Sequence, residues 1–399
     1  MIKIPFGTVT LSKKSRKLIT KALDEKRLSS GKLVREFEKR FASLVGAKEA
    51  VAVSTGTDAD ALALAVLYDL GAKRGDEVII PALSFVATGN AVLQAGLTPV
   101  FVDVELDTLN IDTTLISRAI TNKTRAIMPV HLMGKPAEMD KILAIAKKHS
   151  LLVVGDAAEA HGAIYKGKNV GAMGDMAAYS LYVAHIITTI EGGIITTNNT
   201  DYAQIIRSLR SHGRACMCES CVINTSSAYC AKRFSGEDSS DIRFRFDRVG
   251  FSSKMNELEA AVGLGNLDQY ESILKARRDN LYYLIKKFKR FEDSMFTIRR
   301  EKSEEIGPHA FPFILRKDTP FTREQLMGYL EKNGIDARTL FSSIPTQCPG
   351  FGFLKHDPGD FPRAEFIGKR GLHIGVHQDL GKRECDYFLK ILENFLTSL

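Results

Sequence analysis

The sequence alternates between short apolar runs and segments of helical periodicity, and this alternation limits the possible folds more than any other feature. The apolar runs of strand length cover residues 77–80, 98–104, 126–130, 151–155, 177–182 and 193–197. Helical patterns between and around them include residues 14–26, 33–45 and 60–70. Strands that alternate with helices are typical of a mostly parallel sheet covered by helices. The sequence therefore predicts an α/β protein.

The length of the chain and its C-terminal pattern predict two domains. With 399 residues, 44% of them hydrophobic, the chain can bury one large core and a second, smaller one. A helical pattern over 256–285, continuous or broken, leads into a C-terminal segment of mixed pattern. We expect a large domain over residues 1–265, which includes an irregular loop at 213–248, and a small α+β domain over 266–399.

Charge and hydropathy exclude two classes of partner. No stretch approaches the roughly 18 apolar residues that a membrane span requires. Residues 1–7 lack the apolar core of a secretory signal, so we expect a cytoplasmic protein without a membrane partner. The net charge is +8, but Lys and Arg are interspersed with acids. This pattern predicts a solvated surface that tolerates an anionic substrate, and no nucleic-acid partner.

Two turns at strand ends are candidate ligand sites. A Ser/Thr/Gly turn at residues 54–57 precedes the helical pattern over 60–70, and N–H groups at such a helix start suit a phosphate. The same turn also fits a simple helix cap. Asp156 ends an apolar strand, where ligand groups gather in α/β sheets. It could pair with a protonated pyridine nitrogen or act as a helix N-cap.

The segment 179–193, YSLYVAHIITTIEGG, carries the most informative residue for function. It resembles the signature of nucleotide-sugar aminotransferases, in which a lysine stands at the position of His185. With the motifs at 28–31, 84–88 and 156–162, the likeness to the DegT/DnrJ/EryC1/StrS family of sugar aminotransferases and dehydrases extends over nearly the whole chain. An imidazole cannot form the Schiff base of that lysine, but it can move protons near neutral pH.

The resemblance implies the fold-type I architecture of pyridoxal-phosphate (PLP) enzymes, with a mostly parallel seven-stranded sheet, and a homodimer. It implies cofactor contacts to the phosphate, the ring and the pyridine nitrogen from Gly56, Thr57, Ser180, Phe85 and Asp156.

Two further site residues depart from the family pattern or have a second interpretation. Ser252 replaces the family's asparagine, which reaches the cofactor phosphate of the neighbouring subunit, although a hydroxyl can also donate a hydrogen bond. Arg338 lies in the matching substrate wall, where it either contacts the sugar diphosphate or forms a surface ion pair.

A histidine at the lysine position resembles the 3-dehydrases of 4-keto-6-deoxyhexoses within this family. These enzymes use the amine form of the cofactor, pyridoxamine phosphate (PMP), so the resemblance implies loss of the sugar's C3 hydroxyl. His185 is then the candidate base, and a candidate acid for the departing oxygen. Glu159 either assists near the cofactor amine or is a solvated carboxylate at a helix start. His161 is expected to be structural.

Four of the six cysteines lie close together in the irregular loop: Cys216, Cys218, Cys221 and Cys230. In a cytosolic enzyme such spacing more often binds metal than forms disulfides. The loop resembles that of the iron-sulfur dehydrase of this family, which implies a [2Fe-2S] cluster fed by a flavin or iron-sulfur reductase. That relative, however, takes one ligand from the position of Ala158, which has no thiol. Structural zinc and free thiols therefore remain alternatives.

The expected function is PMP-dependent removal of the C3 hydroxyl from a nucleotide-linked 4-keto-6-deoxyhexose, on a pathway to lipopolysaccharide or to a secreted metabolite. One alternative is a cluster-free dehydratase that regenerates PMP from glutamate, with zinc in the cysteine loop. A non-catalytic sensor and an ordinary sugar aminotransferase are further alternatives, and the last would require another lysine to reach the cofactor.

Overall fold

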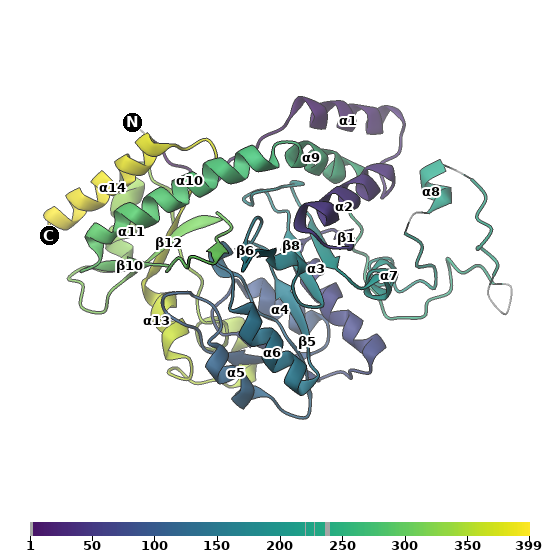
Figure 1. The fold of residues 1–399 in the computed structure, drawn as a ribbon, viewed down its shortest axis with the longest axis horizontal. Coiled ribbons are helices and arrows are strands. Elements are labelled where there is room, and N and C mark those ends of the chain that lie inside the picture. Colours follow the sequence, from purple (N-terminus) through teal and green to yellow (C-terminus); the bar gives the residue numbers. More distant parts are fainter. Residues whose placement is uncertain (1–2, 220, 227, 236–239) are drawn as a thin grey trace.

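A seven-stranded sheet forms the centre of the computed structural model, which describes residues 3–219, 221–226, 228–235 and 240–399 (Figure 1). Its order is β1-β9-β8-β5-β4-β2-β3, and only β9 runs antiparallel to its neighbours. The strands are β1 (Glu49–Val53), β2 (Glu77–Pro81), β3 (Thr98–Val102), β4 (Thr124–Ile127), β5 (Leu152–Asp156), β8 (Met176–Ser180) and β9 (Gly193–Thr197). The prediction of a mostly parallel seven-stranded sheet is confirmed.

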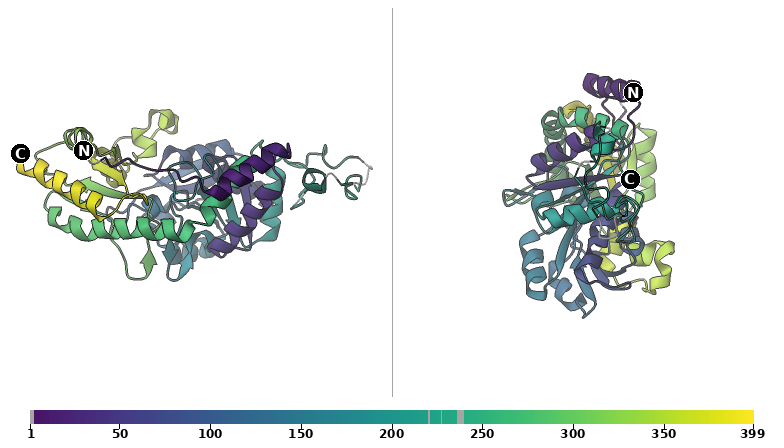
Figure 2. Two further views of the ribbon diagram at one scale, coloured as in Figure 1. Left: turned by 90° about the horizontal axis from the view of Figure 1, so that it is seen from above. Right: turned by 90° about the vertical axis from the view of Figure 1, so that its right-hand side faces the viewer.

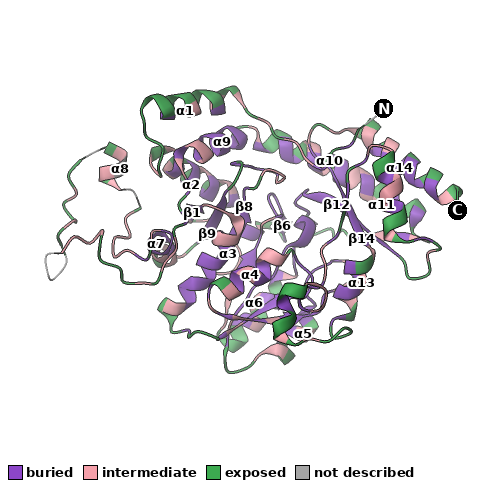
Figure 3. Cartoon of the chain, turned by 180° about the vertical axis from the view of Figure 1, so that it is seen from behind, coloured by how far each residue is buried: buried purple, intermediate pink, exposed green. Residues whose placement is uncertain are grey.

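Helices cover this sheet, so its strands are apolar on both faces. Val154 and Met176 face one core, whereas their neighbours Val153 and Ala177 face another. The covering helices are α1 (Lys13–Asp24), α2 (Lys32–Val45), α3 (Gly56–Ala65), α4 (Val86–Gln94), α5 (Thr113–Ala119), α6 (Met139–His149), α7 (Thr200–Leu209) and α9 (Glu257–Leu267). Figure 3 shows buried strands at the centre and exposed outer faces on α1 and α5.

Helix α2 illustrates a local pattern completed by a distant residue. Its residues Val34, Phe37 and Phe41 recur at helical spacing and are buried. No side chain of the preceding turn caps the helix. Instead, the Glu257 carboxylate at the start of α9 accepts hydrogen bonds from the N–H groups of Gly31, Leu33 and Val34 at 2.9–3.0 Å. A carboxylate at a helix N-terminus also interacts favourably with the helix dipole.

The C-terminal part contains a second, antiparallel sheet of order β10-β12-β14-β13. Its strands are β10 (Met295–Thr297), β12 (Ala310–Leu315), β13 (Ala337–Thr339) and β14 (Gly371–Gly375). Phe288, Phe311, Phe313 and Phe388 pack against one another between this sheet and its helices. The helices of this part are α10 (Tyr270–Phe288), α11 (Arg323–Lys332), α12 (Ile344–Gln347), α13 (Pro362–Arg370) and α14 (Lys382–Thr397). The predicted α+β character of this region is confirmed.

The helical pattern over 256–285 is broken, because α9 ends at Leu267 and α10 begins at Tyr270. The domain boundary after residue 265 stays a prediction. A third small sheet joins the two parts of the chain. It pairs β6 (Ile164–Tyr165) with β7 (Lys168–Asn169) and with β11 (Glu304–Glu305). Strand β11 thereby brings the segment before β12 against the large sheet's loops.

The described residues of the irregular loop predicted at 213–248, with the short helix α8 (Val222–Ser226), project from the body of the molecule (Figure 2). Within its described residues, several aromatic side chains are exposed, including 78% of Tyr229 and 68% of Phe244. No helix in the described part of the chain is long and apolar enough to cross a membrane.

Candidate active site

A cavity of about 910 Å³ lies at the carboxyl ends of the central strands, with its far wall formed by the second sheet. Carboxyl ends of parallel strands are the usual ligand position in such sheets. The strand predicted at 177–182 leaves the sheet after Ser180, and the following loop carries His185 to this cavity. The predicted site residues that line it are Gly56, Thr57, Phe85, Asp156, Glu159, Ser180, His185 and Arg338.

The start of helix α3 suits an anionic group. The Thr55 side chain caps the helix by accepting from the Asp58 N–H at 3.0 Å, which confirms the cap interpretation. Gly56 and Thr57 nevertheless line the cavity, where N–H groups of a first helical turn have no partner within the helix. A Cβ at Gly56 would lie 2.7 Å from the Cβ of Ser180. Only glycine therefore lets β8 approach this helix start.

Asp156 lies at the base of the cavity and is 5% exposed. Its Oδ2 accepts from the Thr88 hydroxyl at 2.7 Å, and its Oδ1 accepts from the Ala158 N–H at 3.1 Å. Burial raises the pKa of Asp156, although both hydrogen bonds lower it. A carboxylate fixed in this way is suited to pair with a protonated ring nitrogen.

Asp60 is a buried cavity residue that sequence reasoning missed. Its side chain is 3% exposed, and its Oδ1 has no hydrogen-bond partner in the described part of the chain. Burial, and then the charge of Asp156, raise the pKa of Asp60 well above its ordinary value, which favours the neutral form of this carboxyl. The available signal was an acid within the otherwise apolar run 59–67.

Phe85 presents an aromatic face to the cavity. It stands at the start of α4 and is 56% exposed, an unusual exposure for a large apolar side chain. Its ring centroid lies 5.4 Å from that of Phe341, which also lines the cavity. This wall is suited to contact a flat ring.

His185 is a neutral imidazole beside a second histidine. Its ring centroid lies 5.0 Å from that of His309, and its Nδ1 is buried without a partner among the described residues. Burial, with smaller contributions from His161 and Arg277, lowers the pKa of His185 to about 3. At neutral pH the ring is therefore uncharged and can accept a proton. Among the described residues that line the cavity, none is a lysine.

Glu159 is buried, so its interpretation as a solvated carboxylate at a helix start is wrong. Its Oε2 accepts from the Met133 N–H at 2.7 Å, and its Oε1 lies 3.3 Å from Nε2 of His309. Burial raises the pKa of Glu159 to about 8, while the Met133 N–H lowers it and the charge of Asp156 raises it. The carboxyl is therefore mostly protonated at neutral pH.

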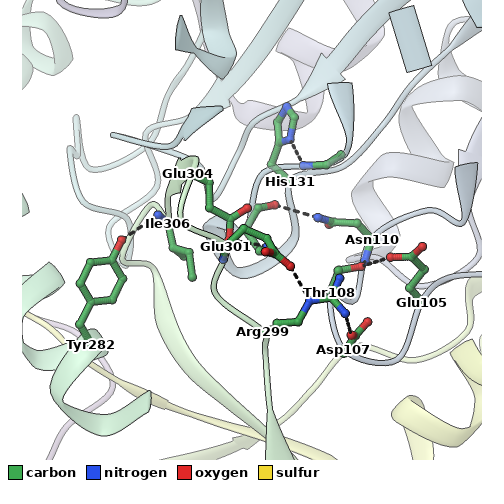
Figure 4. A network of polar contacts seen from close by, with 12 residues as sticks. Glu105, Asp107, Thr108, Asn110, His131, Tyr282, Arg299, Glu301, Glu304 and Ile306 are labelled. Carbon is green, nitrogen blue, oxygen red and sulfur yellow. Dashed lines mark hydrogen bonds and ion pairs between the residues drawn. The ribbon is translucent and has the colours of Figure 1, made fainter. Parts of the chain in front are cut away.

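His309 was not found from the sequence, because it precedes β12 and carries no local motif. Two neighbouring segments hold it in place. Gly307 donates to the Gly134 carbonyl at 2.9 Å, and the Lys135 ammonium forms a buried ion pair with Glu304. Figure 4 shows Glu304 within this network, with Asn110 reaching the backbone of the same loop. The loop that holds Glu159 is thus bound to the segment that carries His309.

His161 has a structural contact, as expected. Its Nε2 lies 2.9 Å from the Ser180 carbonyl oxygen, and its ring packs on Phe41 and Tyr179. Burial lowers the pKa of His161 to about 4, so the neutral ring donates from Nε2 to this carbonyl. The contact fixes the end of β8 just before the loop of His185.

Arg338 forms the ion pair of one of its sequence interpretations, and its contact with the substrate diphosphate stays a prediction. Its guanidinium lies 3.8 Å from the ring centroid of Phe6 and 3.6 Å from the Asp336 carboxylate. Half of the side chain is exposed, and it lines the cavity. Ser252, in contrast, is exposed and lies outside the described lining of the cavity. Its predicted contact with a neighbouring subunit stays a prediction.

The arrangement of strand-end ligand groups around one cavity agrees with a comparison of the whole sequence. The DegT/DnrJ/EryC1/StrS aminotransferase family matches residues 9–393. The chain belongs to this family. Within it, similar proteins include dTDP-4-dehydro-2,6-dideoxy-D-glucose 3-dehydratase of Saccharopolyspora spinosa, which is 35% identical over 98% of this chain and 86% of the relative. GDP-perosamine synthase of Caulobacter vibrioides is 34% identical over 99% of both chains.

Solved structures of family members support the same architecture. GDP-4-keto-6-deoxy-D-mannose-3-dehydratase of E. coli, solved with bound hydrated PLP, superposes with a TM-score of 0.86 at 30% identity. The match covers 98% of this chain and 100% of that structure. Fold-type I architecture is thereby confirmed. The relatives include both 3-dehydratases and a perosamine synthase, so family membership alone does not separate these activities.

Three of the four loop cysteines, Cys216, Cys218 and Cys221, line a second pocket of about 180 Å³. Cys230 is not among the residues that line it. Burial raises the pKa of the Cys218 thiol, and the neighbouring Cys216 raises it further. No group of three or more Cys, His, Asp or Glu among the described residues is arranged to hold a metal ion. The predicted ligand set is therefore only partly brought together. Cationic side chains surround these thiols: Arg35, Arg207, Arg210, Arg214, Arg243 and Lys254.

Proposed function

We propose that this protein removes the C3 hydroxyl of a nucleotide-linked 4-keto-6-deoxyhexose, with PMP bound in the main cavity. One observation carries the proposal: a neutral imidazole, His185, occupies the position of the family's lysine, and no lysine is among the described cavity residues. An aminotransferase needs an amine to hold the aldehyde cofactor between half-reactions. A dehydratase that uses the amine form has no such need.

The cavity residues fit the cofactor. The start of α3, with Gly56, Thr57 and Ser180, would hold its phosphate. The exposed Phe85 ring would lie against its ring, and the fixed carboxylate of Asp156 would pair with its ring nitrogen. When bound as the amine, the cofactor supplies an electron sink for the loss of the hydroxyl. A solved structure of the E. coli dehydratase names PLP as its bound group.

The chain's own residues supply the proton transfers and the substrate contacts. His185 offers an uncharged ring nitrogen that can take a proton and later return it to a departing oxygen. Glu159, protonated near neutral pH, contacts His309, and the ring of His309 packs against that of His185. Arg338 at the cavity wall would contact the substrate diphosphate, for which a guanidinium is a suitable partner. We propose a cytoplasmic homodimer, in which Ser252 reaches the cofactor phosphate of the neighbouring subunit.

The substrate assay separates this function from the alternatives. Purified protein, loaded with PMP, is incubated with a nucleotide-linked 4-keto-6-deoxyhexose and with either glutamate or a reductase system. Mass spectrometry of the product should show loss of the C3 oxygen. A product that keeps this oxygen and gains an amine would instead identify an aminotransferase, as the likeness to GDP-perosamine synthase allows. No oxygen loss under either condition would favour a non-catalytic sensor.

We further propose that the cysteine loop holds a [2Fe-2S] cluster that a reductase supplies with electrons. Three thiols at one cationic pocket support this, since positive side chains offset the charge of thiolate ligands. The described residues are not arranged as a metal site, and Ala158 offers no thiol. Zinc is the second candidate. A GDP-4-keto-6-deoxymannose-3-dehydratase has also been solved with a trapped PLP-glutamate geminal diamine, which favours the alternative of PMP regeneration from glutamate.

Metal analysis decides between these two dehydratases. Protein purified without oxygen is assayed for iron, inorganic sulfide and zinc, and its absorbance spectrum is recorded. Iron and sulfide should be present and should be lost in the Cys216→Ser variant, whereas Cys385→Ser, a buried thiol on α14, should retain them. Protein that holds zinc, or no metal, would point to the cluster-free enzyme.

A further inference from the structure

Two histidines and a glutamate line up beside the cavity. His309 is 6% exposed, its Nε2 lies 3.3 Å from Oε1 of Glu159, and its ring is tilted by 37° against that of His185 at a centroid distance of 5.0 Å. The Nδ1 atoms of both histidines are buried and have no hydrogen-bond partner among the described residues. The charged or titratable groups that face His309 are Glu159, His161, His185, His373 and Arg277.

Buried polar atoms without partners are costly, so two such atoms on neighbouring rings call for a shared explanation. A neutral imidazole has one N–H donor and one bare acceptor. If one Nδ1 carries hydrogen and the other does not, one hydrogen bond between the two neighbouring rings would satisfy both atoms. The Oε2 of Glu159 already accepts from Met133, so a proton on this carboxyl sits on Oε1, toward His309.

We propose that Glu159, His309 and His185 form one proton-conducting chain with two neutral arrangements of the histidines. In the first, Glu159 is ionised, His309 donates from Nε2 to it, and His185 donates from Nδ1 to His309, which leaves Nε2 of His185 bare as a base. In the second, Glu159 is protonated, each of these hydrogen bonds is reversed, and Nε2 of His185 carries a hydrogen as an acid. The role of this chain in turnover rests on the proposed dehydration.

One turnover moves one proton through the chain and back. His185 takes a proton at Nε2, its Nδ1 proton passes to Nδ1 of His309, and the Nε2 proton of His309 passes to Glu159. The return of all three protons delivers one proton from His185 to the departing C3 oxygen, which leaves as water. Protons therefore balance, and no electron is gained or lost by these side chains.

The chain solves an electrostatic difficulty of the site. An isolated His185 would become an imidazolium on taking a proton, and burial opposes this charge strongly. When the protons shift along the chain, both histidines stay neutral and Glu159 changes its charge instead. Burial already favours the protonated form of this carboxyl. The buried ion pair of Lys135 with Glu304 helps to keep His309 within reach of Glu159.

The tautomers of the histidines test the chain without any turnover. Cofactor-free protein with ¹⁵N-labelled histidines is titrated by NMR from about pH 6 to about pH 10, with signals assigned through His185→Gln and His309→Gln. His309 and His185 should change tautomer together as Glu159 loses its proton. The change should vanish in Glu159→Gln. His131, whose Nδ1 accepts from the Ala137 N–H, should keep its Nε2–H tautomer throughout. Unchanged tautomers in the native protein, or the same change in Glu159→Gln, would refute the proposal.

Kinetics distinguishes proton transfer from mere support. His309→Asn can still hydrogen-bond to Glu159 but cannot pass a proton, and His309→Phe can do neither. Both variants should lose about 100-fold in kcat, with KM within about twofold of native. The rise of kcat as Glu159 ionises should also disappear. Near-native kcat in His309→Asn would overturn the proposal in favour of a positioning role. If the native protein shows no dehydration, the NMR result still decides on the chain by itself.

Discussion

Lys135 and Glu304 form an ion pair in which only 2% and 3% of the side chains are exposed. Lys135 follows the loop whose Met133 N–H binds Glu159. Glu304 belongs to β11, which pairs with β6 of the third sheet. The pair thus joins the two segments whose contact places His309 against Glu159. Its geometry links the stability of the fold directly to the candidate active site.

Removing one partner of this pair should destabilise the protein strongly. Lys135→Met leaves the buried Glu304 without its partner, and Glu304→Gln leaves the buried Lys135 without a counter-charge. In comparable pairs such a change lowers the free energy of unfolding by about 3–5 kcal/mol. Thermal unfolding followed by circular dichroism should show a marked fall in Tm for each single variant. The double variant should recover part of this loss. A double variant that loses the sum of both single effects would show that the two side chains do not act as a pair.

A substitution at the start of α3 should weaken cofactor binding. In Gly56→Ala, the added methyl group would lie 2.7 Å from the Cβ of Ser180 and must push the helix start away from β8. We expect folded protein that binds PMP at least about tenfold more weakly, or about 1.4 kcal/mol, in a fluorescence titration. Gly328→Ala in α11, where nothing lies within 4 Å of the new methyl, is the matched control. Equal affinity of both variants for PMP would argue against a phosphate site here.

His185→Lys should restore the covalent attachment that the imidazole prevents. The variant should lose dehydration and show slow amino transfer instead. Borohydride reduction followed by mass spectrometry should label the variant with the aldehyde cofactor at residue 185 and leave the native protein unlabelled. Covalent labelling of the native chain would remove the basis of the proposed function. Unchanged dehydration in the variant would contradict the role of His185 as the base.

Local patterns predicted the parts of this structure that depend on neighbours in sequence. Strands buried on both faces appear as apolar runs, so β5 and β9 were placed to within a residue. Asp156 could be recognised because a strand-end acid is a local feature. Chain direction in the second sheet was not predicted, since its strands pair antiparallel across distant segments.

Long-range contacts account for the residues that the sequence did not reveal. His309 matters only because it meets Glu159, 150 positions earlier, and neither neighbourhood hints at the other. The Glu257 cap of α2 likewise spans more than 220 positions. The burial of Glu159 had no local signal either, because its cover comes from the segments around Met133 and His309. Such contacts are set by tertiary packing and not by periodicity.

The stability of the cofactor-free protein should depend on pH through the buried Glu159 carboxyl. The folded pKa of Glu159, about 8, lies above the ordinary value of 4.5. Between these values the folded state binds more protons than the unfolded state, so its stability falls as pH rises. The stabilisation that Glu159 contributes is fully present below its ordinary pKa, and it is lost as the pH rises through its folded pKa. Buried histidines such as His131 have the opposite effect on stability, because burial lowers their folded pKa from the ordinary 6.5 to about 4. Their contribution to stability therefore changes only below about pH 6.5.

The window from about pH 6.5 to about pH 8.5 therefore spans the folded pKa of Glu159 and lies above the pKa values of the buried histidines, and a difference between native protein and a Glu159 variant isolates this carboxyl. In Glu159→Gln this titration is absent, so the Tm of the variant minus that of the native protein should increase by a few degrees across the window. Glu36→Gln, at an exposed position of α2, controls for the loss of a surface carboxylate and should show no such trend. Parallel Tm curves for native protein and Glu159→Gln would mean that the carboxyl is already ionised at neutral pH. In that case the titration of Glu159, and the change of histidine tautomers coupled to it, would lie below this window, and His185 would rest as the base.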